Sequence, residues 1–138
     1  MIEVPVAELP ETFRILVVEG SFLLVMTIQA MLEDLDWVAV GPASRKADAL
    51  ALAQSETFDA ALLDVNLDGE TSWDVAAVLR SRGIPFVFGT GYDVSSVLPD
   101  DIAGSAVIAK PYNSRDVEQR LREVIAARGR CLTATQLA

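Results

Sequence analysis

The stretch that decides the fold is Phe58-Asp59-Ala60-Ala61-Leu62-Leu63-Asp64-Val65-Asn66-Leu67-Asp68-Gly69. Its apolar run from Ala60 to Leu63 has the length and composition of a strand buried on both faces of a parallel sheet. The run stops at Asp64, and a polar turn that contains Gly69 follows. Open α/β sheets place their ligands and their chemistry at the carboxyl ends of such strands. We therefore expect Asp64 to be the residue that is modified, although an aspartate at this position can also simply begin a loop.

Four other apolar runs along the chain have the same character, and helical patterns separate them. The predicted strands cover residues 14–18, 37–40, 60–63, 86–88 and 106–109. Helices are expected over 22–35, after Ser44, over 72–82 and from Ser114 to about residue 128, with the two serines as caps. Residues 93–104 contain Pro99 and predict only a short or irregular helix. This alternation predicts a parallel sheet with right-handed crossovers and helices on both faces.

Length and composition limit the classes of protein that fit. The 138 residues fit one domain, and a hydrophobic content of 51% provides for a real core. We expect an acidic leader at 1–13, the folded domain at 14–128 and a C-terminal tail at 129–138. No apolar run is long enough to cross a bilayer, and the leader does not resemble a signal peptide, so we expect no membrane insertion and a cytoplasmic protein.

Charge and the absence of certain side chains exclude further classes. The net charge of −9 opposes direct binding to nucleic acid. A single cysteine excludes an internal disulfide. The lack of histidine excludes Ser-His and Cys-His catalysis and the usual zinc sites.

Polar residues stand at the ends of four predicted strands: Glu19, Asp64, Thr90 and Lys110. Because the carboxyl ends of parallel strands share one edge of the sheet, these side chains can converge. Two carboxylates suit Mg²⁺, and a carboxylate can attack phosphorus to give an aspartyl phosphate. A lysine and a hydroxyl can stabilise the transferred phosphoryl group. Each residue alone also has an ordinary interpretation, as a loop acid, a strand former or a solvated charge.

Taken together, these motifs resemble the receiver domain of bacterial two-component response regulators. The matching pieces are Ile15-Leu16-Val17-Val18-Glu19, Leu62-Leu63-Asp64-Val65-Asn66-Leu67, Thr90 and Lys110-Pro111. The resemblance implies a flavodoxin-like, doubly wound five-stranded parallel sheet of order 2-1-3-4-5. It implies that Asp64 accepts a phosphoryl group from a histidine kinase or phosphotransfer protein. It also implies that Thr90 and Lys110 contact that group and that Glu19, Asp64 and the carbonyl of Asn66 hold Mg²⁺.

One further motif resembles that of a narrower group of receivers. The run Phe88-Gly89-Thr90-Gly91-Tyr92 is similar to the Phe-small-Thr-Gly-aromatic motif of a subgroup known mostly from alphaproteobacteria. Members of this subgroup are often stand-alone receivers that work with a distinct group of histidine kinases. The resemblance therefore implies a single-domain regulator that signals to a downstream protein partner.

The sequence departs from the usual receiver pattern in three places. Gly20 stands where the family places a second acid that ligates the metal, so weak Mg²⁺ binding is expected. Asp68 stands where a proline is usual, and its carboxylate can either repel phosphate or replace part of the missing acid. Val107 stands where an aromatic side chain usually switches inward, and Tyr92 is the candidate to take over that role, with simple packing as the alternative.

Three functions compete on these residues. The favoured one is a phosphorylatable single-domain response regulator. The second is a pseudo-receiver, a binding module that works without phosphorylation because Gly20 weakens the metal site. The third, an aspartyl-phosphate phosphohydrolase, needs an acid two residues beyond Asp64, where this chain has Asn66. In the favoured case, we expect phosphorylation to order residues 93–104, which would then form a binding face with the last helix.

Overall fold

The computed structural model describes residues 12–67, 69–91 and 106–137. The expectations about the leader, about Asp68 and Tyr92 and about the ordering of residues 93–104 therefore lie outside the described residues.

Five parallel strands form the central sheet. They are β1 (Arg14–Val18), β2 (Val38–Ala43), β3 (Ala60–Asp64), β6 (Phe86–Thr90) and β7 (Ala106–Ala109). Their order is β2-β1-β3-β6-β7, and every neighbouring pair is parallel. This is the predicted order 2-1-3-4-5, with β6 and β7 as the fourth and fifth strands, and the predicted fold class is confirmed.

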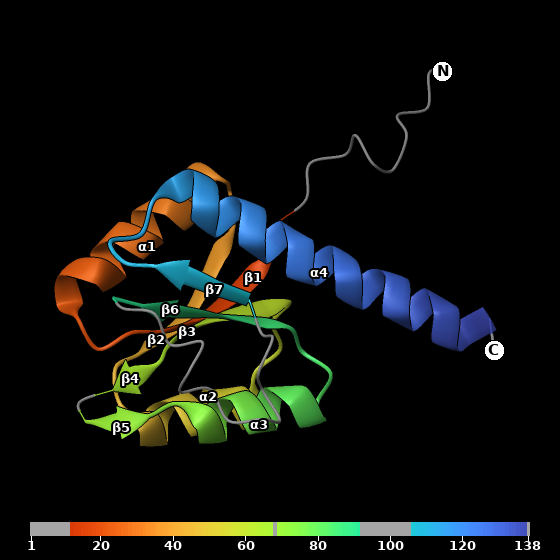
Figure 1. The fold of residues 1–138 in the computed structure, drawn as a ribbon, viewed down its shortest axis with the longest axis horizontal. Coiled ribbons are helices and arrows are strands. Elements are labelled where there is room, and N and C mark those ends of the chain that lie inside the picture. The colour runs from red at the N-terminus through yellow and green to blue at the C-terminus, as the bar shows by residue number, and fades with distance from the viewer. Residues whose placement is uncertain (1–11, 68, 92–105, 138) are drawn as a thin grey trace.

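Helices cover both faces of this sheet (Figure 1). The helices α1 (Phe22–Asp34) and α4 (Ser114–Leu137) lie on one face, and α2 (Lys46–Ser55) and α3 (Trp73–Ser81) lie on the other. Successive residues of a strand point to opposite faces, so each strand contributes to two cores. In β1, Ile15 and Val17 join the core beneath α1 and α4, whereas Leu16 and Val18 join the core beneath α2 and α3.

A small hairpin follows β3 and was predicted only as a polar turn. Its strands are β4 (Asn66–Leu67) and β5 (Glu70–Thr71), which pair in antiparallel fashion. The backbone N–H of Gly69 donates to the Asn66 side chain at 3.0 Å. Gly69 has a φ of +87°, a left-handed conformation that glycine adopts without steric cost. The hairpin therefore fixes the chain directly after Asp64.

Two of the predicted helix caps are wrong. The residue that precedes α2 is Arg45, which makes no side-chain cap, and Ser44 lies one residue earlier. Ser114 is already the first residue of α4, and the cap comes from Asn113, whose side chain accepts the N–H of Asp116 at 2.9 Å. Asparagine caps as well as serine does, so the sequence allowed either neighbour to serve.

Two element ends also differ from the prediction. Strand β2 continues through Gly41-Pro42 to Ala43, with a register shift opposite Leu16–Val18. Helix α4 continues through Gly129 to Leu137 and projects past the sheet (Figure 1), whereas the sequence predicted its end near residue 128. A glycine inside a helix costs only about 1 kcal/mol, and no proline follows to stop the helix. Whether 129–138 lies outside the folded domain stays a prediction.

Candidate active site at the carboxyl edge of the sheet

The strand register brings the predicted site residues together. Val18 of β1 lies opposite Leu63 of β3, so Glu19 and Asp64, the next residue on each strand, are neighbours. Asp64 lies opposite Gly89 of β6. On the far side of β6, Thr90 lies opposite Ala109, and Lys110 follows directly. The four residues selected from the sequence therefore share one edge of the sheet.

The ammonium group of Lys110 bridges the two carboxylates. Its Nζ lies 3.1 Å from Glu19 Oε2 and 3.1 Å from Asp64 Oδ1. Glu19 is 1% exposed, Asp64 7% and Thr90 5%. A buried carboxylate is stable only when it is paired, and here one cation is shared between two of them.

Backbone groups hold each carboxylate from the other side. The N–H of Ser21 donates to Glu19 Oε1 at 3.0 Å, and the N–H of Asn66 donates to Asp64 Oδ1 at 3.2 Å. The Ser21 donor lies in the turn after β1, and the Asn66 donor lies at the start of β4. The segments that follow β1 and β3 therefore fix the directions in which the two carboxylates point.

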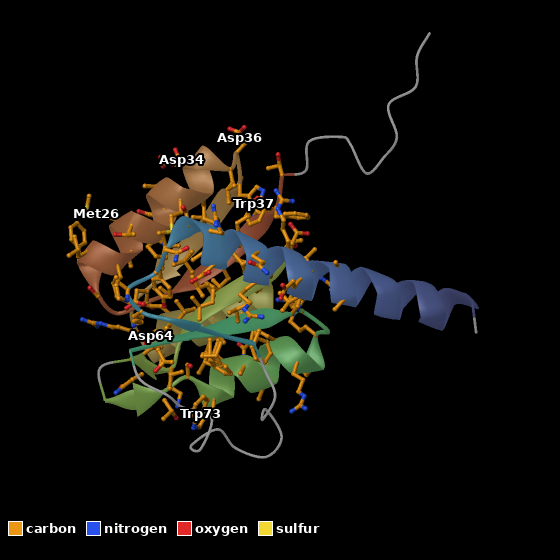
Figure 2. All side chains as sticks on the ribbon, turned by 45° about the horizontal axis from the view of Figure 1, so that its top comes forward. Met26, Asp34, Asp36, Trp37, Asp64 and Trp73 are labelled. Atoms are coloured by element: carbon orange, nitrogen blue, oxygen red, sulfur yellow. The ribbon has the colours of Figure 1, made fainter. Side chains whose placement is uncertain are left out.

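A cleft of about 750 Å³ opens over these side chains. Asp64 stands at the edge of the sheet beside it (Figure 2). The residues that line the cleft are Glu19, Gly20, Ser21, Ser44, Arg45, Asp64, Val65, Asn66, Gly69, Thr90, Gly91 and Lys110. The cleft has room for a phosphoryl group and for a hydrated metal ion next to Asp64.

The electrostatics of the site reflect two acids held close together. Burial raises the pKa of Glu19, and the negative charge of Asp64 raises it further, while the N–H of Ser21 and Lys110 oppose the shift. Burial, followed by the charges of Glu19 and Asp64, also raises the pKa of the Tyr112 hydroxyl, which therefore stays protonated and able to donate. Among the described residues that line the cleft, the two carboxylates of Glu19 and Asp64 thus share the ammonium of Lys110, and Arg45 is the other cationic residue of the lining.

Among the described residues, the donor set at the cleft suits Mg²⁺ in kind and contains two carboxylates, those of Glu19 and Asp64. Carboxylate oxygens of Glu19 and Asp64 face the same cleft, and Asn66 lines it beside them. Mg²⁺ prefers such hard oxygen ligands and retains several waters. Within residues 12–67, 69–91 and 106–137, no group of three His, Cys, Asp or Glu side chains is placed to hold a metal ion. Gly20 lines the cleft without contributing an oxygen from a side chain.

Sequence reasoning missed two residues near the site. Arg45 lines the cleft from the loop that follows β2, and nothing in its local sequence indicates this position. Tyr112, two residues beyond Lys110, is buried and donates its hydroxyl to Glu19 Oε2 at 3.3 Å. An aromatic residue two positions after the strand-end Lys110 was the available signal. Val107, at the position of the usual switching aromatic, packs half-buried against the core beneath α2 and α3.

Comparison with known families identifies the class of protein to which this sheet and this site belong. Residues 15–122 match the model of the response regulator receiver domain, so the chain belongs to that family. Members of this family are phosphoacceptor signalling domains of two-component systems, not enzymes in the usual sense, and histidine kinases are their general partners.

Individual relatives point to the same group of receivers that the fourth-strand motif predicted. The solution structure of SdrG from Sphingomonas melonis Fr1 has 37% sequence identity and a TM-score of 0.72, and the match covers 83% of this chain and 97% of that one. The response regulator PhyR from Brucella abortus has 25% identity and a TM-score of 0.76, over 91% of this chain and 53% of that one. The predicted resemblance to alphaproteobacterial receivers is thereby confirmed.

A curated relative is longer than this chain. The transcriptional regulatory protein PdtaR of Mycobacterium tuberculosis is 26% identical in an alignment 133 residues long that covers 89% of this chain and 65% of PdtaR. The chain thus spans less than two thirds of PdtaR and about half of PhyR. Across the part of the chain that the structure describes, no helix is long and apolar enough to span a membrane.

Proposed function

We propose that this chain is a single-domain response regulator of the cytoplasm. In this proposal, Asp64 accepts a phosphoryl group from a histidine kinase or phosphotransfer protein, and the phosphorylated domain presents an altered surface to a downstream protein. The observation that carries the proposal is the Lys110 ammonium, which lies 3.1 Å from both Asp64 and Glu19 in an open cleft. A phosphoryl group needs this combination of a nucleophile and a fixed positive charge.

The geometry supports a particular role for each atom. Lys110 Nζ and the N–H of Asn66 both contact Oδ1 of Asp64, so we assign the attack on phosphorus to Oδ2. A P–O bond forms to Asp64 as the P–N bond to the donor histidine breaks, and the imidazole keeps the electron pair. Lys110 then offsets the charge of the acyl phosphate, and we assign to Thr90, which lines the same cleft, a hydrogen bond to it. Mg²⁺, when bound to Glu19, Asp64 and the Asn66 carbonyl, would supply further neutralisation of the phosphoryl oxygens.

The proposal is tested by the intact mass of the protein after treatment with a small phosphodonor and Mg²⁺. We expect one added phosphoryl group on the native protein and none on Asp64→Asn. A matched control is Asp36→Asn, because Asp36 is exposed and lies well away from Asp64 (Figure 2). Asp36 has a φ of 60°, which asparagine also tolerates. Equal labelling of Asp64→Asn and native protein would refute the proposal.

One observation favours a second function, a binding module that works without phosphorylation. Gly20 removes an anionic ligand from the metal site, and receivers rely on the metal to neutralise the phosphoryl oxygens. This alternative predicts no mass increase at any Mg²⁺ concentration. It also predicts that partner binding is unchanged by Asp64→Asn.

Beryllofluoride offers a further probe of the proposed switch. One solution structure of SdrG, 38% identical to this chain, is described as its BeF₃-activated conformation. By analogy, we propose that beryllofluoride on Asp64 mimics the phosphorylated state of this chain. Its effect on partner binding should then be lost in Asp64→Asn and retained in Asp36→Asn.

A further inference from the structure

Tyr112 is a buried polar residue that the mechanism above does not use. It lies in the connection between β7 and α4, and it is 6% exposed within the core beneath α1 and α4. Its hydroxyl lies 3.3 Å from Oε2 of Glu19. Most buried tyrosines donate to some hydrogen-bond partner. For Tyr112 that partner is the carboxylate of Glu19, one of the expected metal ligands.

The position opposite Asp64 makes room for the Tyr112 ring. Glu19, Asp64 and Gly89 lie next to one another on adjacent strands, and the alternation along each strand directs them to the same face. A Cβ atom at Gly89 would collide with the hydroxyl and the ring of Tyr112. Gly89 therefore leaves the space in this row of residues through which the phenol reaches Glu19.

The Glu19 carboxylate is fully engaged by donors of this chain. Oε1 receives the N–H of Ser21 at 3.0 Å and Lys110 Nζ at 3.3 Å. Oε2 receives Lys110 Nζ at 3.1 Å and the Tyr112 hydroxyl at 3.3 Å. Of these donors, Lys110 is the one that the acyl phosphate on Asp64 would attract. The Ser21 N–H and Tyr112 then remain to hold Glu19, one on each oxygen.

We propose that Tyr112 is a positioning residue of the metal site: its hydroxyl, admitted by Gly89, fixes Glu19 as a ligand for a divalent cation beside Asp64. The inference rests on the proposed function, since it concerns the same site. It matters more in this chain than in a receiver with two acids after the first strand, because Gly20 leaves Glu19 as the single acid from that turn. Hydrogen-bond partners that orient a ligating side chain typically contribute a factor of about 10 to 100 to metal affinity.

The test is a calorimetric titration of the metal-free protein with Mg²⁺. Tyr112→Phe keeps the ring packed against Gly89 and removes only the hydroxyl, so we expect about tenfold weaker binding. The control is Thr27→Val, which also removes one hydrogen-bonding hydroxyl, in this case one on α1 that donates to the Leu23 carbonyl at 3.0 Å. Thr27→Val should leave the Mg²⁺ affinity unchanged. Equal or tighter binding in Tyr112→Phe overturns the inference.

A double variant separates positioning from a general loss of structure. In a Glu19→Gln background, Tyr112→Phe should weaken Mg²⁺ binding no further, because the ligand it positions is gone. Additive losses in this pair would assign Tyr112 a structural role and overturn the inference.

Failure of the proposed function gives a different result. If the native protein takes up no phosphoryl group in the mass experiment but binds Mg²⁺ with the dependence on Tyr112 described here, then the phosphoacceptor role fails and the positioning role stands. If the native protein is phosphorylated and Tyr112→Phe binds Mg²⁺ as the native protein does, the positioning role alone fails.

Discussion

Replacing Gly20 by aspartate should restore the ligand that the metal site lacks. A Cβ atom at Gly20 would meet no atom within 4 Å, and Gly20 does not have the positive φ that disfavours side chains. The backbone at Gly20 therefore accepts a Cβ atom, and Gly20 lies on the lining of the cleft that also holds Glu19 and Asp64. The oxygens of the new aspartate would face the space in which a cation bound to those two residues would lie.

The size of the effect follows from the exposure of Gly20. Gly20 is exposed, so the water value of the dielectric constant applies to a charge placed there. Two unit charges about 4 Å apart in water attract by about 1 kcal/mol, and a divalent cation doubles this to about 2 kcal/mol. Since 1.4 kcal/mol corresponds to a factor of about ten, Gly20→Asp should bind Mg²⁺ about 30-fold more tightly.

The assay is a titration of metal-free protein with Mg²⁺, followed by calorimetry or tryptophan fluorescence. Gly20→Asn is the matched control, because it has the shape of aspartate without the charge. We expect the asparagine variant to bind close to the native affinity. If the aspartate variant binds no more tightly than the asparagine variant, then the site is already complete without a second acid, and the reasoning from Gly20 is wrong.

Three other measurements test the site. Lys110→Met leaves two buried carboxylates without their shared cation. The free energy of unfolding of metal-free protein, measured in a denaturant titration, should therefore fall by about 3 kcal/mol. Addition of Mg²⁺ should restore part of this stability. The pKa of Glu19 is raised above 4.5 in the folded protein, so its contribution to stability is complete below pH 4.5 and is lost as the pH rises through the raised value. Glu19→Gln should therefore raise the melting temperature of metal-free protein at pH 7, and this advantage should vanish towards pH 4.5. Amide hydrogen exchange with and without beryllofluoride should show added protection between residues 90 and 104, and unchanged exchange there would contradict the predicted ordering.

The sequence predicted the parts of the site that the strand register determines. Glu19, Asp64 and Lys110 each stand at the end of a short apolar run. Parallel pairing places such residues at the carboxyl edge of the sheet, independently of the conformation of the loops. The identity of the neighbours was therefore predictable from strand ends alone. The contact distances, and the fact that one ammonium reaches both carboxylates, needed the structure.

The parts that the sequence did not predict lie in loops and at helix ends. Tyr112 reaches Glu19 because the connection from β7 to α4 turns it back towards Gly89, and no local pattern encodes that turn. The sequence predicts that the last helix ends before Gly129, but α4 continues through it to Leu137. A glycine ends a helix only when the chain beyond it leaves the helical conformation, and that depends on packing as well as on propensity.

The missing acid at Gly20 has two electrostatic consequences that act in opposite directions. It lowers the attraction for a divalent cation, which is the basis of the pseudo-receiver alternative. Among the described residues it also leaves two carboxylates at the cleft, where a second acid after β1 would make three, so an incoming phosphoryl group meets less repulsion. Loss of metal affinity therefore does not by itself imply loss of phosphorylation. A weak Mg²⁺ site with a reactive Asp64 is a consistent state of this domain, and metal affinity and labelling of Asp64 have to be measured separately to distinguish it from a binding module.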